Sequence, residues 1–555
     1  MLYNLLIKKA EKSMNRLSEI FRNVKSGEVI TLENTVYDVK PEDSFVKTGY
    51  YCSNSAKKDE NPAGIRFSAV FLKGVKNLVI DANGAEIRVH GKMTPLLFDS
   101  CENITVKNLT IDYAVPTMTE FTVLKSEGGR IKIKINPDCI YSVSDNTLFW
   151  HGEIADDGKP YWESACNVQK RYFKVYNPET ETTRDFDRNK LTFSELYDRG
   201  EGIVEGVLAE PETEINAGEI FQTRSIVRDQ VGSMFLRCKN LSFENLRVKF
   251  MHGLGMVSQF CENVTFRSCD FTPARGRTIA STADFFQFSG CRGDIVIDSC
   301  KARGAQDDYI NVHGTHLRIV ELDREKGSMT VRFMHPETWG FQAFSEGDTL
   351  DFIRWDTLMP YDSCTVSAFE RIDDTDIRLF VNNIPDCIIV GKDVVENATY
   401  TPNLFVHDCF FGPTSGRGIL CTTRGEIVIE NNHFRKLWGP ALLIEDDCNF
   451  WFESGYTRDI TFRNNIVDSC NFGNTWEGAP AIQVTPKIMN DASREYVHKS
   501  LVITNNRFIN PEWGRHTFVL EYIENVSVKD NYFDAPFEIL EKVTGSIESE
   551  GNITE

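Results

Sequence analysis

Short runs of alternating apolar and polar residues recur along most of the chain, each bounded by Asn, Asp, Ser or Gly. Alternation over four or five residues is typical of a β-strand with one buried face. The copies begin at Asn77, Asn103, Asn240, Asn263, Asp294, Glu426, Asp459, Ser500 and Asn525. Two consecutive copies, at Asn240 and Asn263, start 23 residues apart. This period predicts a solenoid in which each coil buries its apolar face against its neighbours, and we interpret it as a right-handed parallel β-helix. The recurrent asparagines suit tight bends, because Asn tolerates left-handed backbone angles.

Two long intervals interrupt the repeat, and each is long enough for a small β-barrel or β-sandwich. They contain runs typical of antiparallel strands: Arg130–Ile135, Lys190–Phe193, Met329–Phe333 and, as the last strand of the second interval, Asp386–Val390. We therefore expect an all-β protein in five parts. These are an N-terminal cap with the first coils (1–112), inserted domain I (113–233), central coils (234–314), inserted domain II (315–402) and C-terminal coils (403–555). Because the second interval begins directly after Gly314, we expect inserted domain II to help wall off a pocket beside the central coils.

The first residues, Met1 to Val24, place apolar side chains at near-helical spacing, interrupted by three lysines. This pattern predicts an amphipathic helix that covers the open N-terminal end of the solenoid, where strand edges would otherwise lie unpaired. The charges, and the lack of a small-residue cleavage site, argue against a signal peptide and against a membrane span. Fifteen cysteines without a CxxC pair suggest small apolar roles inside the coils and, weakly, a reducing compartment. A cytoplasmic location is favoured unless a leader was trimmed from this sequence.

The formal net charge of −20 argues against nucleic acid and against anionic membranes as partners. It also argues mildly against a polyanionic substrate such as pectate, although a local basic groove would override the global sign. The assembly state, monomer or homodimer, is left open.

Three aspartates occur within the central repeat. Asp307 and Asp308 are adjacent, and Asp284 precedes Asp307 by 23 residues, the interval of the repeat. If one repeat is one coil, Asp284 and Asp307 lie on neighbouring coils, about 4.8 Å apart. On a regular strand Asp307 and Asp308 would point to opposite faces, so both can face water only at a bend, which Gly304 is placed to supply. Carboxylates this close repel one another, and the cluster is costly unless one member holds a proton or chemistry uses the difference.

Glycoside hydrolysis is the functional interpretation of this cluster. One carboxylic acid protonates the leaving oxygen, and another carboxylate, or a pair, activates water. Three alternatives stay open: adjacent aspartates often cap a turn, three oxygens on neighbouring coils would suit calcium as in pectate lyases, and a lyase would need a base, for which Arg303 is the nearest candidate. We favour hydrolysis because Asp284 repeats at coil spacing and aromatic residues flank it, and we expect no metal and no cofactor.

Candidate substrate-binding residues follow the cluster. His313 lies five residues beyond Asp308 and would contact a sugar hydroxyl or hold a carboxylate, with a purely structural role equally open. Trp451 and Glu453 lie where acids and aromatics break the repeat together. Galactose-type sugars stack an apolar face on Trp while carboxylates take the hydroxyls, although an exposed acidic turn is about as good an explanation.

Two further candidates lie in loops. Arg417, in Ser415-Gly416-Arg417-Gly418, and Arg424 either help at the same face or are plain turn residues. Trp339, in the second interval, would reach over the pocket, although the core of a barrel is the more common place for such a residue.

Two of these stretches, Gln306–Gly314 and Asn449–Gly455, resemble glycoside hydrolase family 110, and so does the order of solenoid, insertion, solenoid, insertion, solenoid. The likeness covers nearly the whole chain. It implies a parallel β-helix with inserted β-barrels and an inverting exo-α-galactosidase that removes terminal α-1,3-linked galactose, including from blood group B structures. It also implies Asp307 as the general acid, with Asp284 and Asp308 holding the attacking water. The three aspartates also resemble the arrangement of polygalacturonases, another β-helix family.

The leading hypothesis is thus an inverting α-1,3-galactosidase acting on a galactose-terminated glycan. The alternatives are a β-helix polygalacturonase or polysaccharide lyase, and a non-catalytic carbohydrate-binding solenoid. Because the cluster repels itself, we also expect Asp307→Asn to abolish turnover while raising the melting temperature modestly.

Overall fold

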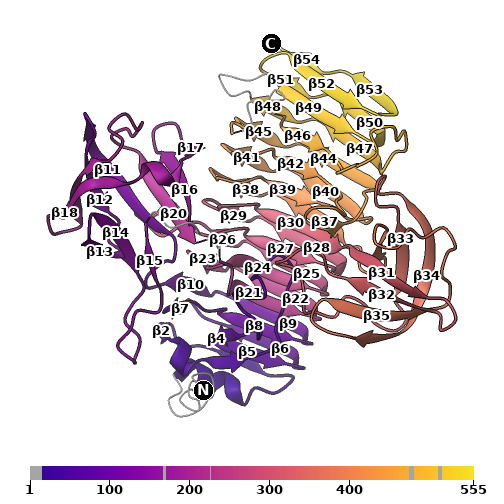
Figure 1. The fold of residues 1–555 in the computed structure, drawn as a ribbon, viewed down its shortest axis with the longest axis horizontal. Helices are drawn as coiled ribbons and strands as arrows, with labels where there is room; N and C mark the ends of the chain where they lie inside the picture. Colours follow the sequence, from indigo (N-terminus) through magenta and orange to yellow (C-terminus); the bar gives the residue numbers. More distant parts are fainter. Residues whose placement is uncertain (1–15, 167–170, 226, 474–479, 510–515) are drawn as a thin grey trace.

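Three parallel sheets run side by side along the length of the molecule (Figure 1). The computed structural model describes residues 16–166, 171–225, 227–473, 480–509 and 516–555. Over these residues the first sheet runs from β1 (Val29–Thr31) to β53 (Ser546–Glu550), the second from β2 (Val36–Val39) to β54 (Ile553–Thr554), and the third from β5 (Val70–Lys73) to β52 (Phe537–Lys542). Each coil contributes one strand to each sheet, as β24 (Leu254–Gln259), β25 (Glu262–Arg267) and β26 (Asp270–Phe271) do. The predicted fold class, a parallel β-helix, is confirmed.

The alternating residues of each strand point in turn to the core and to the solvent. In β25, Val264 and Phe266 are buried while Thr265 between them is partly exposed. The parallel register stacks like on like, so that Phe243, Phe266 and Ile297 are paired residues of successive coils. The rings of Phe243 and Phe266 lie 4.6 Å apart and nearly parallel, at 13°. Such columns give one continuous apolar core in which each coil is covered by its neighbours.

Asparagines turn the chain at two kinds of corner. The outer column, Asn77, Asn103, Asn240 and Asn263, has φ between 54° and 58°, the left-handed region. From Asn103 onward, each side-chain amide donates to the side-chain oxygen of the asparagine before it at 2.7–2.9 Å. An inner column is buried and consists of Asn432, Asn465, Asn506 and Asn531. There, each side-chain oxygen from Asn465 onward accepts the backbone N–H of the equivalent asparagine one coil earlier at 2.9 Å. Both columns satisfy backbone groups that a bend would otherwise leave unpaired.

The N-terminal helix packs against the first coils. Helix α2 (Arg16–Arg22) buries Leu17 and Phe21 in the core of the solenoid. The part of the predicted helix before Arg16 lies outside the described residues. Among the residues that are described, no helix is long and apolar enough to cross a membrane.

The first insertion leaves the solenoid after β10 (Thr110–Tyr113) and returns at β21 (Val231–Leu236). Its main antiparallel sheet contains, in spatial order, β17 (Thr182–Asp185), β16 (Arg171–Asn177), β20 (Ile220–Ser225), β11 (Thr119–Glu127), β12 (Arg130–Ile135), β19 (Ile203–Leu208) and β18 (Phe193–Asp198). A smaller sheet holds β13 (Ile140–Ser144), β14 (Thr147–His151) and β15 (Glu163–Ala165). The prediction of a strand at Lys190–Phe193 was wrong in its first residues. A 3-10 turn, η2 (Arg188–Lys190), precedes β18 because the Asp187 side chain accepts the N–H of Asn189 and caps it.

The second insertion is a closed barrel. It contains, in order around the barrel, β31 (Leu317–Asp323), β32 (Ser328–Arg332), β35 (Asp376–Val381), β34 (Pro360–Arg371), β33 (Thr349–Ile353) and β36 (Val394–Asn397). The prediction of a last strand at Asp386–Val390 was wrong, because β36 takes that place in the barrel and Ile389 and Val390 lie exposed in the loop before it. The buried carboxylate of Asp393 ties this loop down by accepting the N–H of Ile389 at 2.9 Å.

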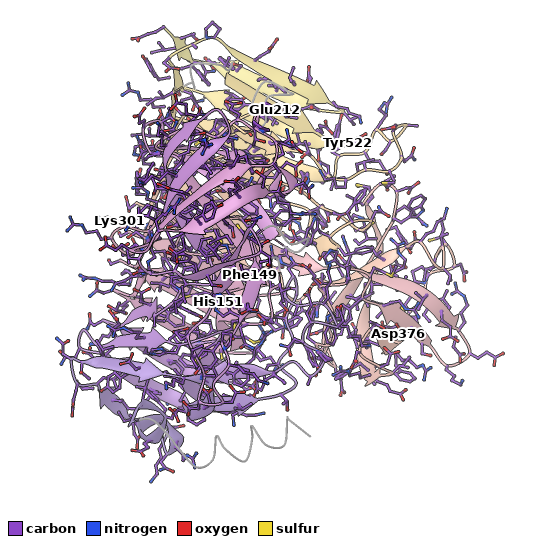
Figure 2. The ribbon with its side chains drawn as sticks, turned by 60° about the vertical axis from the view of Figure 1, so that its left-hand side comes forward. Phe149, His151, Glu212, Lys301, Asp376 and Tyr522 are labelled. Atoms are coloured by element: carbon purple, nitrogen blue, oxygen red, sulfur yellow. The ribbon has the colours of Figure 1, made fainter. Side chains whose placement is uncertain are left out.

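The two insertions flank the solenoid, the first on the left and the barrel on the right of Figure 1. In Figure 2 the first insertion, marked by Phe149 and His151, comes forward over the coils, while Asp376 marks the barrel standing apart on the right.

Candidate active site

The three aspartates lie in the turns that lead into two neighbouring strands of the third sheet. Strand β27 (Phe286–Ser289) pairs with β30 (Ile310–Thr315), with Phe286 opposite Ile310, so this coil spans 24 residues. Asp284 and Asp308 each stand two residues before these partners and therefore occupy equivalent positions. The sequence period of 23 had matched Asp284 with Asp307 instead. The placement of the two turns on neighbouring coils agrees with the prediction. Because this coil is one residue longer than the sequence repeat, however, Asp308 and not Asp307 is the residue equivalent to Asp284.

Arg417 is the third member of this column. Strand β39 (Ile419–Cys421) pairs with β30, with Ile419 opposite Ile310, although the barrel separates the two in sequence. Arg417 therefore follows Asp284 and Asp308 at the same position on the third successive coil. The register alone places a guanidinium directly beside the acidic pair.

Two glycines shape the bend that carries Asp307. Gly304 has φ of 77°, as expected of a residue that supplies the bend. A Cβ on Gly416 would lie 2.0 Å from the carbonyl oxygen of Asp307, so only glycine lets the next coil approach this closely. Below the bend, the Tyr309 ring stacks on Phe285 at 5.3 Å and its hydroxyl donates to the Gly412 carbonyl at 2.8 Å. The turn that carries the aspartates is thus packed against stacked aromatic rings.

The carboxylates converge, and two arginines hold them. One oxygen from each aspartate lies within 4.8 Å of the others. Arg417 donates to both oxygens of Asp308, at 2.5 and 2.8 Å, and Arg228 donates to Asp307 at 3.2 Å. Asp284 and Asp308 are buried, at 4% and 1% exposure, whereas 31% of the Asp307 side chain is exposed. Asp307 is the member that an incoming ligand reaches first.

Their pKa values move in opposite directions. Burial, then the charges of Asp307 and Asp308, hold the pKa of Asp284 well above its ordinary value. Burial likewise raises the pKa of Asp308 to about 7, against the opposing pull of Arg417. Burial would also raise the pKa of Asp307, but Arg417 and Arg228 outweigh it and the pKa falls below its ordinary value. The cluster therefore keeps a proton at neutral pH, shared on the Asp284 and Asp308 side.

The aspartates line a small cavity that continues into a larger groove. The cavity has a volume of about 80 Å³ and is also lined by Arg228, Arg417, Glu445, Glu453, Trp451, Asn54, Asn311 and Leu420. The groove has a volume of about 510 Å³ and shares Asp307, Arg228, Arg417 and Trp451 with the cavity. Asp307 is the one triad member that lines both, so it stands at their boundary.

Glu453 is fixed in the cavity by amide groups. Strand β43 (Glu453–Ser454) folds back against β30, and the Glu453 carboxylate accepts from Asn54 at 2.5 Å and from Asn311 at 3.3 Å. His313 is buried behind it, with its Nε2 3.8 Å from the Glu453 carboxylate. The ring of His313 is engaged elsewhere, because its Nδ1 lies 2.6 Å from the Gly314 carbonyl oxygen and its Nε2 lies 3.2 Å from the Gln287 side-chain nitrogen. It is not among the residues that line the cavity, so these contacts agree with the structural role left open for it rather than with a sugar contact.

Trp451 is presented by a short loop that one carboxylate organises. Asp447 accepts the backbone N–H groups of Asn449, Phe450, Trp451 and Phe452. The indole of Trp451 rests against the His335 ring, with centroids 4.3 Å apart, and 47% of the residue stays exposed. This gives a backed aromatic surface where the cavity meets the groove.

Comparison with known proteins identifies the family. Residues 328–395 match the GLAA-B beta-barrel domain II family. Alpha-1,3-galactosidase A of Bacteroides fragilis is 36% identical over 517 residues, which cover 91% of this chain and 83% of that protein. Alpha-1,3-galactosidase A of Akkermansia muciniphila is 35% identical over 445 residues, covering 79% of this chain and 71% of that protein. The chain belongs to glycoside hydrolase family 110. A solved family 28 exopolygalacturonase of Yersinia enterocolitica has a TM-score of 0.34 and 10% identity, covering 96% of this chain and 74% of that one, and contributes nothing to the assignment.

Three candidates lie elsewhere in this family 110 protein. The prediction that Trp339 reaches over the pocket is corrected: it is 4% exposed in the barrel core, and its indole N–H donates to the Ala56 carbonyl at 3.0 Å. Arg303, considered as a lyase base, donates to the Tyr176 hydroxyl at 2.9 Å and lines neither the cavity nor the groove. Arg424 pairs with Asp351 at 2.9 Å and with Glu396 on the barrel. A bound calcium ion is also disfavoured, because the guanidinium groups of Arg228 and Arg417 already contact the aspartates.

Four polar or charged cavity residues of this family 110 site are not among the residues predicted from the sequence. Asn311 and Glu445 lie near predicted site residues in the sequence, but neither was itself a candidate. Asn54 and Arg228 lie outside the repeat and carry no local signal. Arg228 is placed by its neighbour Asp229, which contacts His252 at 2.7 Å and Lys92 at 3.1 Å and so anchors the returning end of the first insertion. Only the fold brings these segments to the cavity.

Proposed function

We propose that the protein removes a terminal α-1,3-linked galactose from the non-reducing end of a glycan, with inversion at the anomeric carbon. Relatives at 36% and 35% identity over most of the chain are named alpha-1,3-galactosidase A. The observation that carries the proposal is the convergence of three aspartates on a small cavity that opens into a larger groove. A small cavity for one sugar and a groove for the remainder suit an enzyme that acts on chain ends.

We assign the general acid to Asp307 and the holding of the attacking water to Asp284 and Asp308. The leaving oxygen joins the released sugar to the rest of the glycan, so it must lie where cavity and groove meet, and Asp307 lines both. The pKa directions oppose this assignment in the free enzyme, since the proton resides on the Asp284 and Asp308 side. We give more weight to the position of Asp307 than to its protonation state in the free enzyme. Its oxygen lies within 4.8 Å of those of the other two carboxyl groups, and a proton held by such a coupled cluster is shared among its members.

The stereochemical outcome needs its own support. Carboxyl groups of inverting enzymes usually stand about 6.5–9.5 Å apart, and those of retaining enzymes about 5–5.5 Å. The separation within this triad, at most 4.8 Å between nearest oxygens, is short for either class. Inversion is therefore proposed from three carboxylates rather than two: a pair grips one water, and the third member delivers the proton.

The other cavity residues bind and orient the sugar. The exposed Trp451 offers an apolar face for galactose, and Glu453 and Glu445 offer carboxylate acceptors for hydroxyl groups. Arg417 fixes the orientation of Asp308 through its two-pronged contact, and His313 backs Glu453.

A glycan panel tests the proposal. Turnover is measured on linear α-1,3-, α-1,4- and α-1,6-linked galactosides and on the branched blood group B determinant, with NMR of the first-formed anomer. We expect cleavage of α-1,3 linkages and initial release of β-galactose. Initial α-galactose would replace inversion by a covalent mechanism, and absence of turnover with glycan binding retained would leave a binding protein.

Leaving-group dependence tests the roles of the aspartates. Asp307→Asn should lose nearly all turnover of a natural disaccharide yet retain much more on α-galactosyl fluoride, whose departure needs no proton. Asp284→Asn and Asp308→Asn should lose both activities, because each removes a group that holds the attacking water. If Asp284→Asn instead is the variant rescued by fluoride, the acid is Asp284.

A further inference from the structure

The groove beside the cavity is built by three parts of the chain. The solenoid contributes Gln306, Trp438 and the segment Ser415–Arg417, and the barrel insertion contributes Glu337. The first insertion contributes Tyr172, Lys174, Asp185 and Arg224. No feature of the mechanism proposed above uses these last four residues.

The four residues form one face of the inserted sheet. Tyr172 of β16 lies opposite Arg224 of β20, and Lys174 of β16 lies opposite Asp185 of β17. Tyr172 and Lys174 stand two residues apart, so their side chains project from the same side of the strand. The register therefore directs an aromatic ring and two cations toward the groove together.

The residues that line the groove carry more positive than negative charges. Its lining includes five cationic residues, Lys57, Lys174, Arg224, Arg228 and Arg417, and three anionic ones, Asp185, Asp307 and Glu337. Lys174 pairs with Asp185 at 2.7 Å, Arg228 pairs with Asp307 at 3.2 Å, and Arg417 is held by Asp308 below. Among the described residues, Lys57, Arg224 and Glu337 form no ion pair within 4.0 Å, so two cations and one carboxylate remain, and the groove keeps one positive charge more than its pairs cancel.

Arg224 has no carboxylate partner within 4.0 Å among the described residues. Its contacts are the Thr282 carbonyl and the face of the half-exposed Tyr172, whose ring centroid is 5.5 Å from the guanidinium carbon. Burial and the charge of Arg228 lower the pKa of Arg224 to about 10, against the opposing charges of Asp307 and Asp284, which leaves it positive at neutral pH. A partly desolvated cation without a direct carboxylate contact attracts an anion more strongly than a solvated one does.

We propose that this groove holds the part of the glycan that remains after galactose is released, and that Arg224 selects glycans whose retained part carries an anionic group, a carboxylate or a sulfate ester, near the scissile linkage. The inference rests on the proposed function and adds to it the substrate class. It also assigns a task to the first insertion, which supplies Arg224 and the Tyr172 ring beside it. The negative charge of the whole chain does not oppose this selection, because the groove is locally cationic.

Three matched disaccharides test the proposal. Each carries α-1,3-linked galactose on a galactose that is plain, 6-sulfated or oxidised to galacturonate, and kcat/KM is measured for each. For the wild-type protein we expect about a tenfold preference for at least one charged disaccharide over the plain one, decreasing as salt is added. Arg224→Gln should bring that ratio close to one, and Arg224→Lys should keep part of it because the charge remains without the planar donor fork.

Arg130→Gln is the matched control, since it removes the same charge from the same insertion at an exposed site outside the groove. It should keep the wild-type ratio. A preference for sulfate alone or galacturonate alone supports the proposal and identifies the group. A wild-type ratio of one or below, or an unchanged ratio in Arg224→Gln, overturns it.

Failure of the proposed function gives a different result. In that case the wild-type protein cleaves none of the three disaccharides. Calorimetric titration with galactose, galactose 6-sulfate and galacturonate then tests the groove directly. Tighter binding of a charged sugar by the wild-type protein than by Arg224→Gln supports the selection, and equal binding overturns it.

Discussion

At the scale of residues, the column Asp284, Asp308, Arg417 explains how a solenoid concentrates charge. A parallel register repeats one position at every coil, so three unremarkable loop residues become neighbours. Burial pushes the carboxyl pKa values up, while the guanidinium at the end of the column stabilises the anionic form of its neighbour. The cluster retains a proton near neutrality for this reason.

That proton sets the expected pH dependence. The pKa of Asp308 is raised to about 7 and that of Asp284 well above its ordinary value, so the free protein loses one triad proton, that of Asp308, as pH rises through about 7. Because departure of the leaving group consumes a triad proton, and Asp308 is one of its two sources, kcat/KM on a natural disaccharide should begin to fall as pH rises through about 7. A pH–rate profile on a natural disaccharide and on α-galactosyl fluoride measures this. A constant kcat/KM between pH 6 and 9 would contradict the assignment.

Stability should respond in opposite ways to two similar substitutions. The environment favours the charged form of Asp307 and the neutral form of Asp284. At pH 8, Asp307→Asn should therefore lower the melting temperature and Asp284→Asn should raise it, each by something on the order of 1–2 °C. The first half reverses the rise expected from sequence, where the contacts of Asp307 with Arg228 and Arg417 were not visible.

Acid conditions provide the control for these two variants. A carboxyl group with a raised pKa contributes its full stability below the unfolded value and loses it as pH rises through the folded value. The gain in Asp284→Asn should accordingly shrink toward pH 4, where Asp284 is protonated in the parent. A gain that persists unchanged at pH 4 would show that packing, not charge, is responsible.

At the scale of elements, the inner asparagine column is the clearest local determinant of the coils. The Asn465 oxygen accepts the N–H of Asn432, and its amide donates to the Ile429 carbonyl, both at 2.9 Å. Asn465→Ala would leave both buried groups unpaired, at a cost of about 1–3 kcal/mol for each. We expect a destabilisation of that order in denaturant unfolding.

The outer position Asn525 offers the comparison. It is exposed, and its oxygen accepts only the Ser546 hydroxyl at 2.9 Å. Asn525→Ala should cost less than about 0.5 kcal/mol, as surface substitutions usually do. Equal losses in the two variants would mean that the inner column does not stabilise the corners.

Sequence reasoning reached the elements that repeat and missed those that do not. The β-helix and the neighbouring coils of Asp284 and Asp307 follow from alternation and a period, because both are written in consecutive residues. The 24-residue coil was beyond reach, since a one-residue bend leaves no pattern of its own. The strand expected at Asp386–Val390 failed because a run of apolar residues looks alike in a strand and in a loop pinned by a carboxylate such as Asp393.

The candidate site was also predictable only in part. Arg417, Trp451 and Glu453 were candidates on composition, and the fold brings them to one cavity with the aspartates. Arg228 and Asn54 come from segments far away in sequence, and their place depends on long-range packing that a single sequence does not display. Trp339 was a candidate because a large aromatic side chain suits a sugar surface as well as a barrel core, and it occupies the core, which is the more common place.

At the scale of the whole molecule, a solenoid should unfold unevenly along its length. Strands β27 and β30 are paired on both sides near the middle, whereas β52 carries side chains that are largely exposed. Because each coil is stabilised mainly by its neighbours, amides of β27 and β30 should exchange more slowly than those of β52 to β54. Hydrogen-exchange mass spectrometry measures this difference. Uniform protection along the chain would indicate a single cooperative unit instead.

The pairing of Ile310 with Ile419 has a consequence for ancestry. The chain departs for a whole barrel and then resumes the next coil with its register undisturbed. An inserted domain can therefore be gained, replaced or lost between these two strands without changing the register of the β-helix that carries the active site. Related proteins with this architecture can change which substituted sugars they accept by replacing an inserted domain, while the β-helix is kept.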